Sequence, residues 1–378
     1  MSDVYQQSVE LHRQRQGKLA IASKVPLATR FDLSLAYTPG VAEICRVIAR
    51  DKKEARALTL KGNTVAVISD GSAILGLGNL GPEAALPVME GKCILFKEFA
   101  GVDAFPICLD TQDEEEIIRT VKYLAPVFGG INLEDISAPR CFKIEERLKE
   151  ELDIPVMHDD QHGTATVVLA GLINALKVRG LEPDRASLVI SGAGAAGVAI
   201  TKLLLAYGFK DIIVCDRQGT IYQGREGLSG AKQELAGLTN HALVRGDLAA
   251  ALKGADVFIG VSAPNMLTAD MVRGMDEKAI IFALANPVPE IMPEEAKKAG
   301  AFIVASGRSD YPNQINNVLV FPGVFRGALD NSVRDITDAM LIRAAQNLAA
   351  LVSEPTPDKI LPDPLDKTVA KAVAAAIY

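Results

Sequence analysis

The stretch GAGAAG, from Gly192 to Gly197, constrains the fold of this chain more than any other feature. It directly follows the short apolar run ASLVIS and opens AAGVAITKLLLAYG, whose apolar residues recur at helical spacing. An acid, Asp216, ends the next apolar run, DIIVCD, about 20 residues beyond the glycines. A strand, a glycine turn, a helix and a second strand ending in an acid make a dinucleotide-binding βαβ unit. The sequence therefore predicts a doubly wound parallel sheet that binds a dinucleotide.

Each residue of this turn has an expected task. Gly192 permits the tight turn, Gly194 lets the backbone approach the pyrophosphate, and Gly197 lets the helix pack closely on the strand. Ala195 and Ala196 lie in the first helical turn, where free N–H groups and a partial positive charge face the phosphates. We expect all five residues to line the cofactor site.

The residues after the second strand bear on the choice of cofactor. Asp216 can accept hydrogen bonds from an adenosine ribose, which favours NAD. Arg217 beside it can instead meet a 2′-phosphate, which favours NADP. The sequence leaves the two nearly balanced, with a slight preference for NAD.

A second copy of the glycine pattern, GLGNLG, runs from Gly76 to Gly81. It follows the turn signal Asp70-Gly71 and is followed at once by Pro82, and it has no strand ending in an acid. We expect a tight loop near a ligand here and not a second nucleotide site.

The organisation of the chain indicates two domains. Its 378 residues exceed what one hydrophobic core usually serves. From about residue 184 onward, short apolar runs alternate with helical segments, as the buried strands of a parallel sheet do; these runs are ASLVIS, DIIVCD, ADVFIG, AIIFALA and AFIVAS. The predicted fold class is α/β, with a mixed α/β catalytic domain over 1–160 and a Rossmann-like domain over 161–378. Helices within about 331–378 are expected to pack back on the first domain.

Two other segments give less regular signals. GKCILFKEFAG is an apolar run that we interpret as a strand, with Lys92 before it and Lys97 within it. EPTPDKILPDPLDK contains four prolines and is typical of a linker before a short Ala-rich helix.

Composition excludes several classes of protein. With 49% hydrophobic and 23% charged residues, the chain is typical of soluble globular proteins. A net charge of −7 without a basic patch argues against nucleic acid as a partner. No apolar segment is long and uninterrupted enough to span a bilayer, and the polar N-terminus lacks the apolar core of a signal peptide. Five dispersed cysteines suit a reducing compartment, so we expect a cytoplasmic protein.

Two groups of acids suggest a divalent metal. Glu134 and Asp135 are adjacent, and the segment HDDQH at 158–162 adds two more carboxylates. Oxygen-rich clusters suit Mg²⁺ or Mn²⁺, whereas the two histidines lack the third ligand of a zinc site. Taken alone, each acid pair also fits a helix cap or a solvated turn.

Long segments of this chain resemble the malic enzyme family, in its short prokaryotic form. The resemblance runs from about residue 24 to the end of the chain. It rests on PLATRFDLSLAYTPGVAEIC, VISDGSAILGLGNLG, PVMEGKCILFKEFAGVDAFPI, FGGINLEDI, PVMHDDQHGTA, VISGAGAAG, ALANPVPEI and GRSDYPNQINNVLVFPG.

This resemblance implies metal-dependent oxidative decarboxylation of L-malate to pyruvate and CO₂ with reduction of NAD⁺ or NADP⁺, in a homodimer. It also allows oxaloacetate decarboxylation. By their positions in the matching motifs, it gives the roles of general acid to Tyr37, general base to Lys92, metal ligands to Glu134, Asp135 and Asp160, and substrate contacts to Asn286 and Asn317, with Asn286 also beside the cofactor.

The implied chemistry asks for these residue types. Lys92 takes the C2 hydroxyl proton as hydride leaves for the nicotinamide, which requires a pKa lowered by burial or by nearby positive charge. A metal stabilises the enolate left after CO₂ departs, and Tyr37 protonates C3 of that enol. Lys97 is a weaker candidate for the base.

One position departs from the family pattern. Larger relatives carry an arginine for a substrate carboxylate where this chain has Ala73. Arg308 and Arg326 are candidates for the missing cation.

Two other functions remain open. A 2-hydroxy-acid dehydrogenase that stops at the keto acid would use the same nucleotide fold but would not need the metal carboxylates. A nucleotide-binding sensor without catalytic activity is the second alternative, and the retention of Tyr37, Lys92 and the three ligand carboxylates argues against it.

Overall fold

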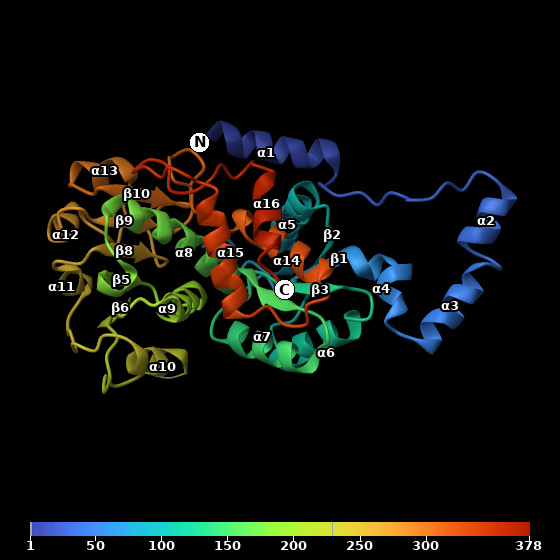
Figure 1. The fold of residues 1–378 in the computed structure, drawn as a ribbon, viewed down its shortest axis with the longest axis horizontal. Coiled ribbons are helices and arrows are strands. Elements are labelled where there is room, and N and C mark those ends of the chain that lie inside the picture. The colour runs from blue at the N-terminus through green and yellow to red at the C-terminus, as the bar shows by residue number, and fades with distance from the viewer. Residues whose placement is uncertain (1, 229) are drawn as a thin grey trace.

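The computed structural model describes residues 2–228 and 230–378, which form two sheets of mainly parallel strands surrounded by helices (Figure 1). The helix α8 (Asp159–Arg179) runs from the end of the first sheet toward the second. These two sheets confirm the α/β fold class. No helix in the described ranges is long and apolar enough to cross a membrane.

The first sheet has four parallel strands in the order β2-β1-β3-β4. Val65 and Val67 pack on one face in a cluster with α5, whereas Ala66 and Ile68 pack on the other face with α6 and α7. The strands and helices are β1 (Thr64–Ser69), β2 (Asp103–Cys108), β3 (Gly130–Leu133), β4 (Val156–His158), α5 (Pro82–Ala100), α6 (Glu114–Leu124) and α7 (Arg140–Glu151).

The second sheet has the order β10-β9-β8-β5-β6-β7, and only β7 is antiparallel. The chain reverses its direction of winding between β5 and β8, and the carboxyl ends of these strands are where a doubly wound sheet binds its ligand. All five apolar runs predicted as strands are strands. The elements are β5 (Ser187–Ser191), α9 (Ala195–Tyr207), β6 (Asp211–Asp216), β7 (Gly219–Thr220), α10 (Ala231–Leu238), α11 (Leu248–Leu252), β8 (Val257–Gly260), α12 (Ala269–Arg273), β9 (Ile280–Ala283), α13 (Pro293–Lys298) and β10 (Ile303–Ser306).

The C-terminal helices connect the two sheets. They are α14 (Phe321–Asp330), α15 (Asp338–Ala350) and α16 (Thr368–Ala374). Phe321 and Phe325 of α14 pack edge-on against Phe96 of α5, and α15 lies along α8. One continuous core therefore extends from the first sheet to the second.

Two expectations from the sequence were wrong. GKCILFKEFAG is part of the 19-residue helix α5 and not a strand, because a helix buried along its length is as apolar as a buried strand. EPTPDKILPDPLDK is not a free linker. Asn313 donates to the Pro357 carbonyl and accepts from the Ile360 N–H, and Asn174 donates to the Ile360 carbonyl, so this stretch is fixed to the body.

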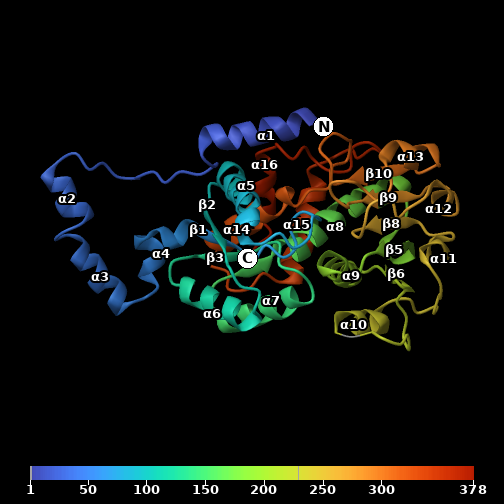
Figure 2. The ribbon, with the colours of Figure 1, turned by 180° about the vertical axis from the view of Figure 1, so that it is seen from behind.

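The N-terminal part forms an arm outside this body. After α1 (Ser2–Arg15), the chain extends to α2 (Arg30–Ala36) and α3 (Val41–Arg50) and returns through α4 (Glu54–Leu58). Figures 1 and 2 show α2 and α3 apart from both sheets, and neither helix has a buried residue. We call residues 19–50 the arm.

Candidate functional site

The glycine turn after β5 leaves room for a phosphate group. Gly192 has φ +121°, and a Cβ there would lie 2.6 Å from the Val261 carbonyl oxygen. A Cβ on Gly197 would lie 1.9 Å from the Gly192 carbonyl oxygen, so helix and strand meet backbone to backbone. By contrast, nothing lies within 4 Å of a Cβ on Gly194. No side chain caps α9, which begins at Ala195, so its N–H groups are directed into this open space.

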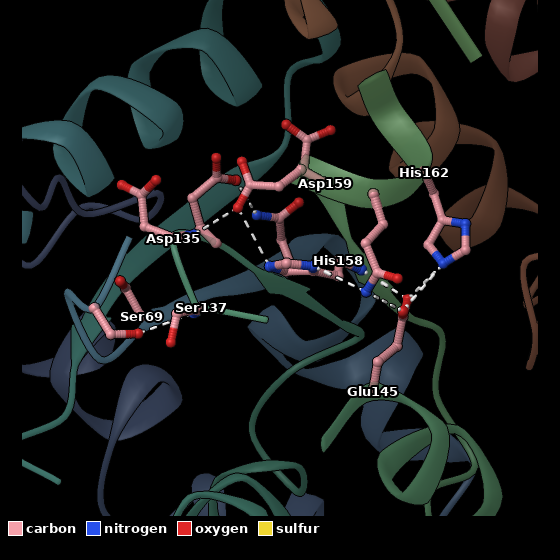
Figure 3. Close-up of polar contacts among 12 residues, drawn as sticks. Ser69, Asp135, Ser137, Glu145, His158, Asp159 and His162 are labelled. Atoms are coloured by element: carbon pink, nitrogen blue, oxygen red, sulfur yellow. Dashed lines mark hydrogen bonds and ion pairs between the residues drawn. The ribbon is translucent and has the colours of Figure 1, made fainter. Parts of the chain in front are cut away.

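Three carboxylates converge at the carboxyl ends of two neighbouring strands. Glu134 and Asp135 follow β3, and Asp160 lies in the first turn of α8, just after β4. Oxygens of the three side chains all lie within 4.8 Å of one another. The Asp135 N–H donates to Asp160 Oδ2 at 2.8 Å, which joins the two strand ends (Figure 3). Asp135 has φ +53°, a strained conformation for a residue other than glycine.

The electrostatics of this cluster fit a divalent cation. Burial and then the Asp160 charge raise the pKa of Asp135 to about 7. Burial also raises the pKa of Glu134 well above its usual range, although Lys92 opposes that effect. Asp135 Oδ2 is buried without a hydrogen-bond partner among the described residues. Buried carboxylates that repel one another and leave an oxygen unpaired provide the hard ligands that Mg²⁺ and Mn²⁺ bind.

Lys92 reaches this cluster from α5. Its Nζ lies 3.0 Å from Glu134 Oε1, forms a second ion pair with Asp159, and stands 4.3 Å from the centre of the Phe321 ring. Burial alone would lower the pKa of Lys92, as expected, but the Asp159 and Glu134 carboxylates outweigh it and raise that pKa well above its ordinary value. Two neighbouring carboxylates, which the sequence does not place beside Lys92, therefore set the direction of its pKa shift.

Asp159 links Lys92 to a residue from the other end of the chain. Asn317, in the 3₁₀ turn Asn317–Leu319, donates from Nδ2 to Asp159 Oδ2 at 2.5 Å. Asp159 is fully buried, and a Cβ on Gly163 would collide with its Oδ1 at 1.8 Å. The glycine of HDDQHG therefore makes room for this carboxylate, and the segment places Asp159 toward the lysine and Asp160 toward the acids.

The two histidines of this segment belong to a second network, behind the carboxylates. Glu145 of α7 accepts from the His158 N–H at 2.9 Å, from Gln161 Nε2 at 2.9 Å and from His162 Nε2 at 3.0 Å (Figure 3). His158 Nε2 lies 3.3 Å from Asp160 Oδ2, without the alignment of a hydrogen bond. Sequence reasoning missed Glu145. The signal was present, because Glu145 lies at helical spacing from two apolar residues of CFKIEERLKEEL, Cys141 and Leu148.

Asn286 lies where the GLGNLG loop meets the segment that follows β9. Its carbonyl oxygen would lie 2.4 Å from a Cβ on Gly76, so the GLGNLG loop packs on the ANP segment after β9. Its side chain lies against Gly307, where an added Cβ would be 2.8 Å from Nδ2. The GLGNLG loop thus borders the region between the sheets.

The remaining candidates lie elsewhere. Tyr37, at the end of α2, is 66% exposed on the arm and is not brought to Lys92 in this chain. Lys97 is on the surface in an ion pair with Asp103. Arg326 binds Asp330 and Asn63, which precedes β1 and lies at the opposite edge of the sheet.

The position without its arginine lies beside the carboxylates. The Ala73 N–H donates to the Asp135 carbonyl at 3.0 Å. Arg308 forms an ion pair with Asp310 and stacks near Tyr311. The structure therefore gives no support to Arg326 as a replacement and shows Arg308 engaged with its own neighbour.

Comparison with known proteins agrees with this geometry. Residues 16–149 match the family profile described as malic enzyme, N-terminal domain, and residues 161–378 match that described as malic enzyme, NAD binding domain. A bifunctional malic/malolactic enzyme of Bacillus subtilis is 56% identical over 375 residues, which are 98% of this chain and 92% of that protein. An NAD-dependent malic enzyme of Geobacillus stearothermophilus is 57% identical over 96% of this chain and 76% of its own length.

A solved structure gives the same result. The crystal structure of an NAD-dependent malic enzyme from Thermotoga maritima has a TM-score of 0.95 to this chain at 51% identity, over 98% of each chain. Because the match covers 98% of each chain, neither chain has a large unmatched segment. On these matches the chain belongs to the malic enzyme family.

Proposed function

We propose that this protein is a malic enzyme, which oxidises L-malate with NAD⁺ or NADP⁺ and releases pyruvate and CO₂. Family membership supports the reaction. The observation that carries the proposal is the position of Lys92, whose Nζ touches both Glu134 of the carboxylate cluster and Asp159, the partner of Asn317. A base, a metal site and a substrate amide therefore lie together at one edge of the first sheet.

In this proposal, Glu134, Asp135 and Asp160 hold Mg²⁺ or Mn²⁺. The cation supplies Lewis-acid stabilisation of the oxygen that gains negative charge. Lys92 takes the proton of the malate C2 hydroxyl, and for this it must first be neutral. Asp159 is in direct contact with Lys92 Nζ, so it is the group of this chain that can accept the proton that Lys92 must lose to become neutral. Asn317 and Asn286 donate amide hydrogen bonds to substrate carboxylates without changing the charge of the site.

The dinucleotide binds at the turn after β5. The open space at Gly194 and the uncapped N–H groups of Ala195, Ala196 and Gly197 receive its pyrophosphate, and Gly192 keeps the turn tight. Asn286, in the segment that follows β9, would contact the bound cofactor at the carboxyl ends of the strands.

Tyr37 acts as the general acid from a second copy of the chain. The arm that carries it exposes a run of apolar side chains in this protomer: Ile21, Val25, Leu27, Phe31, Leu35 and Tyr37. Apolar surface of this extent marks an interface. A homodimer that exchanges arms covers these side chains and supplies each site with the tyrosine that its own chain holds outside the body.

The proposed compartment and domain division follow the sequence argument. The five cysteines are all unpaired, which suits the cytoplasm. A division near residue 160 separates the two sheets, with the start of α8 contributing Asp160 to the first of them.

The test is an assay of purified protein with L-malate and Mn²⁺, run with NAD⁺ and with NADP⁺. We expect reduced cofactor and pyruvate in equal amounts, both abolished by a chelator. Reduced cofactor with oxaloacetate and no pyruvate would identify a simple 2-hydroxy-acid dehydrogenase. Nucleotide binding with no turnover of malate would identify the catalytically silent sensor. Lactate is measured in the same reactions, since one relative is named a malic/malolactic enzyme.

A further inference from the structure

Asp216, the acid expected to bind the adenosine ribose, is already occupied by partners from its own chain. Its Oδ1 accepts the Gln218 N–H at 2.9 Å. Its Oδ2 accepts from Arg225 Nη2 and from Lys232 Nζ, both at 2.7 Å. The side chain of Asp216 is only 7% exposed. Three of the roughly four acceptor sites of this carboxylate are therefore in use before any nucleotide binds.

These contacts fix the carboxylate in place. Arg225 also donates to the carbonyls of Gly219 and Thr220, at 3.2 and 2.9 Å, so it joins Asp216 to the β7 hairpin. Burial would raise the pKa of Asp216, but the hydrogen bonds from Arg225 and Lys232 lower it to about 2. Asp216 is thus ionised at neutral pH, and its charge is balanced within the protein.

The group lies beside the phosphate-binding turn. The Gly192 N–H donates to the Cys215 carbonyl at 2.9 Å. The next residue, Asp216, therefore lies beside the glycine turn. Arg217 is exposed, and no ion pair or hydrogen bond of its side chain occurs within 2–228 or 230–378. Lys232 keeps 41% of its side chain exposed although it contacts Asp216. Two cations are therefore accessible where the adenosine end of a dinucleotide lies.

Nearby acids do not neutralise these cations. Asp247 caps α11 by accepting the Ala250 N–H at 2.9 Å, and Glu234 of α10 is paired with Lys202 of α9 at 2.8 Å. Within 2–228 and 230–378, Arg225 and Lys232 form ion pairs only with Asp216, and Arg217 forms none. A ribose hydroxyl needs a free acceptor, whereas a 2′-phosphate needs cations.

We infer that this end of the site recognises the 2′-phosphate of NADP, with Arg217 and Lys232 as the specificity-determining residues. Asp216 is a positioning residue that orients Lys232, and Arg225 holds Asp216 in place by a hydrogen bond. This reverses the slight preference for NAD drawn from the sequence. The inference deepens the proposed function and rests on it for the presence of a dinucleotide site.

The experiment is calorimetric titration of the full-length protein, without malate or metal, using two matched probes. Adenosine 2′,5′-bisphosphate carries the 2′-phosphate, and adenosine 5′-monophosphate does not. We expect the bisphosphate to bind about tenfold tighter or more, a difference of about 1.4 kcal/mol or more. In Arg217→Ala and Lys232→Ala this preference should shrink, and in the double variant it should disappear, while the affinity for the monophosphate stays within about twofold.

The control variant is Lys202→Ala, which removes an exposed lysine of the neighbouring helix whose partner is Glu234. It should keep the preference for the bisphosphate. Equal affinity for both probes in the unmodified protein, or a preference that survives the double variant, would overturn the inference and leave the malic enzyme proposal intact. Failure to bind either probe would overturn both, because the dinucleotide site itself would be missing.

A second variant separates positioning from ribose binding. Asp216→Asn removes the ion pair that orients Lys232. We therefore expect a smaller preference for the bisphosphate and an unchanged affinity for the monophosphate. If Asp216 instead bound the ribose hydroxyls, the monophosphate would lose affinity in this variant, and the inference would be wrong. Thermal unfolding of each variant shows that the compared proteins are folded.

Discussion

Lys92 of α5 and Glu134 at the end of β3 meet in a buried ion pair, with Nζ 3.0 Å from Oε1. This contact joins the proposed base to one of the proposed metal ligands. Because Glu134 raises the pKa of Lys92, a cation that takes up the charge of Glu134 also makes Lys92 easier to deprotonate. In the proposed mechanism, metal binding and proton removal would be coupled through the Glu134 carboxylate.

The first prediction concerns the base. Lys92→Met should lower kcat by about 10²–10⁴-fold, because general base catalysis supplies about that factor. The matched control is Lys97→Met, which removes the exposed lysine paired with Asp103 and should leave kcat nearly unchanged. Steady-state rates with malate and nucleotide binding measured separately check the result. Equal losses in the two variants would contradict the assignment.

The second prediction concerns the carboxylates without metal. The pKa of Asp135 is raised to about 7 in the folded chain, against about 3.9 in an unfolded one. The folded state therefore binds more protons between these values, so metal-free protein should lose stability as pH rises from about 4 to 7. The loss is at most about 4 kcal/mol for this group.

Urea unfolding at pH 5.5 and pH 7.5 measures about half of that loss, with a chelator and then with Mn²⁺. Added Mn²⁺ should remove most of the pH dependence, because it favours the ionised carboxylates. Asp135→Asn should flatten the metal-free profile and abolish the stabilisation by Mn²⁺. A metal-free protein that becomes more stable between these pH values would refute the prediction.

The third prediction concerns the network behind the metal site. Glu145 accepts three hydrogen bonds from the segment that carries Asp160. Glu145→Gln replaces one acceptor oxygen with a donor, so the segment must shift, and Mn²⁺ affinity should fall by about 10–100-fold. Electron paramagnetic resonance of free Mn²⁺ gives that affinity without turnover. Glu146→Gln changes the exposed neighbour and should have no effect.

The sequence predicted what local pattern determines. Five buried strands of the second sheet were recognised because short apolar runs between helices have few other interpretations. Helix α5 was mistaken for a strand because burial on all sides removes the periodicity that separates the two. The pattern of apolar residues therefore identifies a buried segment more reliably than it identifies its conformation.

The candidate site was predictable in its members and not in its contacts. The resemblance named Lys92 and the three acids, but the ion pairs of Lys92 with Glu134 and Asp159 join residues 42 and 67 positions away. The occupation of Asp216 by Arg225 and Lys232 likewise depends on how the β7 hairpin and α10 return to β6. Sequence spacing does not show such pairing. The pairing reversed the expected direction of the Lys92 pKa shift and the expected role of Asp216.

The last prediction tests how Tyr37 reaches the site. Tyr37→Phe and Lys92→Met should each be inactive alone. If arms are exchanged, a mixed dimer has one site with Lys92 from one chain and Tyr37 from the other, and a second site that lacks both. Random pairing makes half of the dimers mixed, so coexpression should restore about one quarter of the unmodified activity. Purification through two different tags isolates the mixed dimer, which should have about half. Absence of any recovery in that isolated dimer would show that Tyr37 serves its own chain. The arm, on which Tyr37 is exposed, would then have to move toward Lys92 of the same chain.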